Sequence, residues 1–141
     1  METGGRAPLL GLTLAAAALR FATLGQQSFW FDEASTGRLM RMGLGSMIRA
    51  LPDGESTPPL YYVLAWVWTR AFGTGEVGLR SLSALAGTLT VLAVYAAAAR
   101  LFDRRAGLAA AALATFSPLL IWYSQEARAY ALLVLLSAAS V

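Results

Sequence analysis

The sequence predicts an all-α polytopic membrane protein, built from transmembrane helices plus juxtamembrane amphipathic helices in its first outer loop. Of the 141 residues, 57% are hydrophobic and only 13% are charged, and the mean hydropathy is +0.58. A soluble domain is nearer half apolar and a quarter charged. Residues 81–99 and 106–125 are uncharged runs. Each is close to the length of about 20 residues that a membrane-spanning helix needs.

The composition also excludes several kinds of chemistry. The chain has no Cys and no His, and all eleven of its basic residues are Arg. Disulfides, thiolate nucleophiles and imidazole bases are therefore ruled out within this sequence. The net charge of +3 is small, and we expect no nucleic-acid partner. Membrane lipids are the expected surroundings.

The apolar runs predict four spans, at about residues 8–24, 81–101, 106–123 and 129–141. Arg20 interrupts the first span and is expected to snorkel toward an interface. A cleaved signal peptide is the alternative interpretation of this segment. The last span is incomplete, because the sequence ends 13 residues into it. We therefore expect residues 1–141 to be the N-terminal part of a single transmembrane domain that continues beyond them.

Arginines indicate the orientation of these spans. Residues 100–105 hold three Arg against one Asp, and the positive-inside rule places such a loop in the cytoplasm. Residues 26–80 then form an outer loop, and residues 125–130 lie on the same outer side. Residues 58–72 are predicted to be an interfacial helix that does not cross, because the uncharged run 56–69 is only 14 residues long.

Residues 28–36, SFWFDEAST, place three aromatic residues directly before two carboxylates, Asp32 and Glu33. Aromatic side chains favour the membrane–water interface, so this stretch is expected to leave the bilayer and present acid groups to water. Asp32 lies where the N-cap of a basic amphipathic helix over residues 33–49 is expected. Acid groups here could activate a hydroxyl, and outer arginines could hold a lipid phosphate.

Five motifs in this order resemble a known family: FWFDEAS, TPPLYYVLAWVW, FGTGEVGLRSLSALAG, ARLFDRRAGLAAA and SPLLIWYSQEARAYAL. They are similar to the N-terminal part of membrane-embedded glycosyltransferases of the C superfamily. Within it they are most similar to the bacterial relatives of protein O-mannosyltransferases and lipid A aminoarabinose transferases. The resemblance extends over the chain from about Leu10.

The resemblance implies a cell-envelope enzyme that transfers a hexosyl or pentosyl group from a polyprenyl-phosphate sugar donor to a hydroxyl of a lipid, glycan or protein acceptor. Transfer would invert the anomeric carbon. The active site would lie on the extracytoplasmic face of a multi-pass cell-membrane protein. No cofactor is implied, and a divalent metal stays open. We expect residues 1–141 by themselves to be inactive, because most of the donor-lipid pocket would lie outside them.

The resemblance also suggests roles for individual residues. Asp32 would be the general base on the acceptor hydroxyl, and Glu33 a second candidate, although a first-turn acid favoured by the helix dipole explains Glu33 more simply. The remaining predicted substrate-binding residues are Tyr61, Arg80, Glu126 and Arg128, with the two arginines expected to meet phosphate.

A polytopic transporter or flippase-like protein without sugar transfer is the alternative function. Ion-coupled transporters normally place carboxylates or His inside their spans. Apart from Arg20 in the first span and Arg100 at the end of the second, the predicted spans here carry no Asp, Glu, Lys, Arg or His. The acid groups gather outside the spans, which favours the enzyme.

Overall fold

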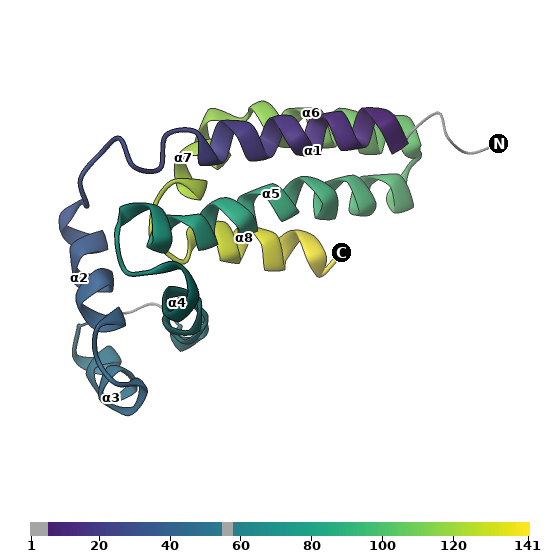
Figure 1. Ribbon diagram of the computed structural model, residues 1–141. Coiled ribbons are helices and arrows are strands. Elements are labelled where there is room, and N and C mark those ends of the chain that lie inside the picture. The colour runs from purple at the N-terminus through teal and green to yellow at the C-terminus, as the bar shows by residue number, and fades with distance from the viewer. Residues whose placement is uncertain (1–5, 55–57) are drawn as a thin grey trace.

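The computed structural model describes residues 6–54 and 58–141, and this part of the chain is entirely helical apart from turns and connections (Figure 1). The all-α prediction is confirmed. The described helices are α1 (Arg6–Phe21), α2 (Phe31–Met40), α3 (Leu44–Gly54), α4 (Pro59–Phe72), α5 (Glu76–Leu101), α6 (Arg104–Phe116), α7 (Pro118–Ser124) and α8 (Tyr130–Ala139).

Four helices, α1, α5, α6 and α8, run side by side with α5 between the others (Figure 1). Their core is made of small and β-branched side chains, including Ala16, Val91, Ala111 and Ala114. Gly107 shows why small residues are needed, since a Cβ there would lie 2.9 Å from the Tyr95 carbonyl oxygen. Small residues let helix backbones approach closely, which is how membrane helices commonly associate.

Helices α2, α3 and α4 gather at one end of this bundle, and α4 is seen nearly end-on in Figure 1, across the direction of the bundle helices. Their core has larger side chains, with Met40, Met47, Tyr62 and, from α5, Leu79 completely or almost completely buried. An orientation across the bundle is what a helix that does not cross the membrane would adopt. The place of α4 in the membrane itself stays a prediction.

Only α5, among the described residues, is long and apolar enough to cross a membrane by itself. Helices α6 and α7 pass the same test together, but they are bent by 61° at their junction. Helices α1 and α8 are apolar but shorter. Length and composition thus support one span, or two if the bent pair is one, and the multi-pass topology stays a prediction.

The predicted amphipathic helix over residues 33–49 is two helices, α2 and α3, separated by a break near Gly43. The Met42 carbonyl oxygen accepts hydrogen bonds from Trp66 Nε1 (2.9 Å) and Arg70 Nη2 (3.2 Å). These bonds from α4 stabilise the break. The N-cap of α2 is Trp30, and Asp32 is the second residue of the helix, so the prediction that Asp32 is the N-cap is wrong.

The predicted continuous helix over residues 106–125 is broken before Pro118, which has no N–H to donate to the Ala114 carbonyl. Arg20 satisfies the freed groups. Its Nη2 donates to the Ala114 carbonyl oxygen (2.9 Å) and its Nη1 to the Thr115 carbonyl oxygen (3.3 Å). Arg20 is fully buried, so the expectation that it snorkels to an interface is wrong. The bend provides polar partners inside the bundle.

Candidate functional site

The candidate site lies at the end of the bundle where α2 begins and where the connection between α7 and α8 passes. A buried ion pair between Glu33 and Arg80 joins these segments. Arg80 donates from Nε to Glu33 Oε1 (2.8 Å) and from Nη2 to Glu33 Oε2 (2.6 Å). The two side chains are only 2% and 4% exposed. This bidentate arrangement is the strongest geometry for an arginine and a carboxylate.

Glu33 also accepts two backbone hydrogen bonds. Trp30 N donates to its Oε2 (3.1 Å) and Ala127 N to its Oε1 (2.7 Å). The first bond caps the start of α2, as an acid at the third helical position does in a capping box. The second ties α2 to the segment that carries Glu126 and Arg128. One carboxylate therefore aligns the two halves of the site.

The pKa of Glu33 reflects this environment. Burial by itself raises the pKa, but the hydrogen bonds from Arg80, Ala127 and Trp30 and the Arg80 charge outweigh it and hold the Glu33 pKa below its ordinary value. Glu33 is thus kept ionised and fully hydrogen-bonded. This favours the first-turn, structural interpretation of Glu33 over a role as a second base.

Arg80 has no N–H left for a ligand. An arginine side chain has five N–H donors. Besides the two that meet Glu33, Nη1 donates to the Leu24 (2.8 Å) and Gln27 (2.7 Å) carbonyl oxygens, and Nη2 donates to the Ser28 carbonyl oxygen (3.2 Å). Arg80 therefore has no N–H group left to donate to the phosphate that it was expected to bind. It instead fixes the connection between α1 and α2.

Asp32, Glu33, Glu126 and Arg128 line one cavity of about 370 Å³, together with the aromatic residues Trp30, Tyr123 and Tyr130. Asp32 is exposed, and its carboxylate accepts no hydrogen bond from the described residues. Arg128 lies with its guanidinium carbon 5.9 Å from the centre of the Tyr130 ring. The structure therefore brings together four of the six predicted site residues, with the acid at an open position and a basic residue in the same wall.

Tyr61 and Arg80 line neighbouring cavities instead. Tyr61 lies in an apolar cavity of about 290 Å³ that shares Arg128 and Tyr130 with the Asp32 cavity. Its buried hydroxyl has no hydrogen-bond partner among the described residues, and burial raises the pKa of this hydroxyl. Arg80 lies in a cavity of about 270 Å³. The predicted residues are thus distributed over three adjoining cavities.

Sequence reasoning missed Trp30, Trp122 and Tyr123 as residues that line these cavities. It placed Trp30 only at the membrane interface and gave Trp122 and Tyr123 no role. A usable signal was present, because Trp122 and Glu126 are four residues apart, and Trp122 Nε1 donates to Glu126 Oε1 (2.7 Å). Within residues 6–54 and 58–141, no three acidic side chains come together in a way that could hold a metal ion.

A family model described as dolichyl-phosphate-mannose-protein mannosyltransferase matches residues 56–141. No curated protein and no solved structure matches the chain. The matched region includes Arg80 and the segment with Glu126 and Arg128. Asp32 and Glu33 precede it, but the Glu33 carboxylate bonds to both of its parts. The chain therefore belongs to the dolichyl-phosphate-mannose-protein mannosyltransferase family, a family of membrane-bound glycosyltransferases.

Proposed function

We propose that the gene product transfers a sugar from a polyprenyl phosphate to an acceptor hydroxyl with inversion, and that Asp32 is the general base. The observation that carries this proposal is that Asp32 and Arg128 line the same cavity in a chain of the mannosyltransferase family. In this proposal the acid takes the acceptor proton and the arginine faces the donor phosphate. The sugar itself is not specified by these residues.

Asp32 is better suited to the role of general base than its neighbour Glu33. The Glu33 carboxylate already accepts four hydrogen bonds, from Arg80 twice and from two backbone amides. The Asp32 carboxylate accepts none from the described residues and is exposed to the cavity. A general base must be within hydrogen-bond reach of the proton that it removes, and of this pair only Asp32 is open to an incoming hydroxyl.

In the proposed step, the acceptor oxygen attacks the anomeric carbon while its proton passes to Asp32. A carbon–oxygen bond to the acceptor forms, and the bond between the anomeric carbon and the phosphate oxygen breaks. The electron pair of that bond leaves with the polyprenyl phosphate. Arg128 would stabilise the charge that develops on the leaving phosphate, where a fixed cation lowers the barrier most.

The cavity is proposed to open on the extracytoplasmic side. The Arg-rich connection between α5 and α6 lies at the opposite end of the bundle from α2 (Figure 1). It holds Arg100, Arg104 and Arg105 against Asp103. Since the positive-inside rule places such a loop in the cytoplasm, the end that carries Asp32 would face outward.

The test is Asp32→Asn in the complete gene product, assayed in membranes with a polyprenyl-phosphate sugar. The amide cannot accept the proton, so we expect transfer per folded enzyme to fall by about 10²–10⁴-fold. Because Asp32 is not the N-cap of α2, little stability should be lost. The matched control is Asp103→Asn at the far end of the bundle, where Asn caps α6 as well as Asp does, and it should leave the rate unchanged. Near wild-type turnover in Asp32→Asn would contradict the proposed role.

A further inference from the structure

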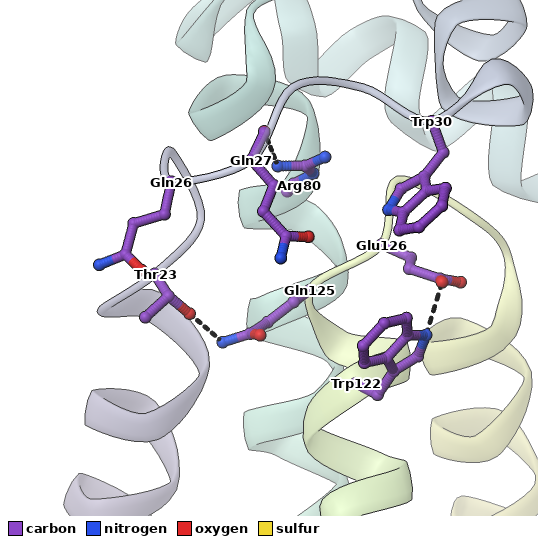
Figure 2. A pocket seen from close by; sticks show the side chains of 8 residues that line it. All are labelled: Thr23, Gln26, Gln27, Trp30, Arg80, Trp122, Gln125 and Glu126. Carbon is purple, nitrogen blue, oxygen red and sulfur yellow. Dashed lines mark hydrogen bonds between the residues drawn. The ribbon is translucent and has the colours of Figure 1, made fainter.

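A second polar cavity adjoins the Asp32 cavity. It has a volume of about 270 Å³ and lies between the connection that follows α1 and the end of α7 (Figure 2). Trp30 and Glu126 line both cavities. The two cavities therefore adjoin at these two side chains.

The walls of this cavity combine aromatic faces with polar groups that are not otherwise used. The Trp30 and Trp122 side chains are 57% and 52% exposed. The side-chain amides of Gln26 and Gln27 make no hydrogen bond with the described residues. Figure 2 shows the Glu126 carboxylate beside the Trp122 ring. One of its oxygens accepts the hydrogen bond from Trp122, and the other is left open.

The same cavity offers no cation to an anionic ligand. Arg80 is the basic residue in its wall, and all of its N–H groups are already bonded to Glu33 and to backbone carbonyls. A phosphate would therefore meet the Glu126 carboxylate without a compensating arginine. The Asp32 cavity has Arg128 in its wall beside the Asp32 and Glu126 carboxylates, so a phosphate there would meet a cation as well. The two cavities thus suit different ends of a reaction, a neutral ligand in one and a phosphate in the other.

Anchoring in the membrane interface is the simpler explanation of two exposed Trp side chains. An anchor does not need a carboxylate held against one indole, nor unbonded amides on the facing wall. A sugar ring needs both kinds of group. Its C–H face packs on the electron-rich face of an aromatic ring. Its hydroxyls pair with amides, which donate and accept, and with carboxylates, which accept.

We propose that this second cavity binds a neutral saccharide as the acceptor, and that the acceptor hydroxyl reaches Asp32 past Trp30 and Glu126. This inference rests on the proposed transferase function and adds the chemical class of its acceptor. Trp122 is the proposed stacking platform. Glu126, Gln26 and Gln27 are the proposed hydroxyl partners.

The kinetic test uses Trp122→Leu and Glu126→Gln in the complete gene product, with a panel of neutral methyl glycosides as acceptors. The glycosides are those of mannose, glucose, galactose and N-acetylglucosamine. Each variant is expected to raise the KM for the accepted glycoside about tenfold, the effect of losing one good contact. The KM for the polyprenyl-phosphate donor is expected to stay unchanged in Trp122→Leu, since Trp122 lies outside the Asp32 cavity. Gln can still accept the hydrogen bond from Trp122, so Glu126→Gln keeps the wall intact. Phe116→Leu, an exposed aromatic outside both cavities, is the control.

The binding test separates this inference from the proposed function. Saturation-transfer NMR with the same glycosides should show binding to Asp32→Asn protein and loss of binding in Trp122→Leu. Binding that depends on Trp122, in a wild-type protein that shows no transferase activity, would overturn the proposed function and leave the saccharide site standing. Transferase activity with an acceptor KM unchanged in both variants would overturn the saccharide site. So would transfer to Ser- or Thr-containing peptides alone, without glycoside binding.

Discussion

Arg20 and Arg80 are both buried arginines, but their positive charges are balanced in different ways. Arg80 meets the Glu33 carboxylate in a bidentate pair. The partners of Arg20 are the Ala16, Ala114 and Thr115 carbonyl oxygens and the Ser124 hydroxyl, at 2.9–3.3 Å. Arg80 thus has an ionised partner from another helix, whereas Arg20 has only the dipoles of carbonyl and hydroxyl groups.

The difference shows that a broken helix can replace a carboxylate as the partner of a buried cation. The carbonyls at the C-terminus of α6 have no helical amides to accept from, because Pro118 begins the next helix. They also lie at the negative end of the helix dipole. Gly87 makes room for this arrangement, since a Cβ there would collide with the Ser124 hydroxyl that bonds to Arg20.

The two arginines also hold different parts of the site. Arg80 and Glu33 attach α2, with Asp32, to the bundle. Arg20 holds the bend between α6 and α7, from which the chain continues to Glu126 and Arg128. Gln125 strengthens this second attachment, since its Nε2 donates to Thr23 Oγ1 at 2.7 Å. Substitutions at the two arginines should therefore lower the stability by different amounts, because only the loss of Arg80 leaves an opposite charge, the Glu33 carboxylate, buried and unpaired.

The largest effect is expected from Arg80→Met. This change leaves the Glu33 carboxylate buried without its cation, and breaking one partner of a buried pair costs about 3–5 kcal/mol of unfolding free energy. Thermal unfolding of the gene product in detergent measures it. The double variant Arg80→Met with Glu33→Gln should recover part of the loss, because the remaining group is neutral. A single variant that loses less than the double variant would contradict the ion-pair explanation.

A smaller effect is expected from Arg20→Met, because no carboxylate is left behind. The Ala114 and Thr115 carbonyls lose their donors, and a buried polar group left without a partner costs about 1–3 kcal/mol. The same unfolding measurement applies. Arg20→Lys keeps the charge but not the planar fork that reaches several acceptors, so it should restore only part of the stability. Full restoration by Lys would show that charge alone, not the set of hydrogen bonds, matters here.

The smallest loss of stability is expected when the pH is lowered. The Glu33 pKa is lowered in the folded protein, so the unfolded chain binds a proton more readily. The stability from this group is present above the ordinary Glu pKa of about 4.3 and is lost as pH falls through the lower folded value. Unfolding curves between neutral pH and acid should show this loss. The Arg80→Met, Glu33→Gln double variant should lack this part of the pH dependence, and an unchanged acid profile would contradict it.

Part of this architecture could be predicted because it depends on local sequence. Apolar runs without charge gave the approximate positions of α5 and of the α6–α7 pair, and Pro59 with Gly73 bounds α4. The break at Pro118 could also have been predicted, since proline inside a helical pattern ends or bends the helix. The interpretation of residues 106–125 as one helix gave hydropathy more weight than this proline.

Tertiary structure alone decided which charged groups are partners. Glu33 and Arg80 are 47 residues apart, and Arg20 and Ala114 are 94 residues apart. The sequence singled out both Asp32 and Glu33, yet two adjacent acids look alike until the fold buries one and exposes the other. The burial of Arg20 likewise required carbonyls that exist only where α6 ends beside α1. Hydropathy and helix signals act between near neighbours, whereas the partner of a buried charge is chosen by the packing of distant segments.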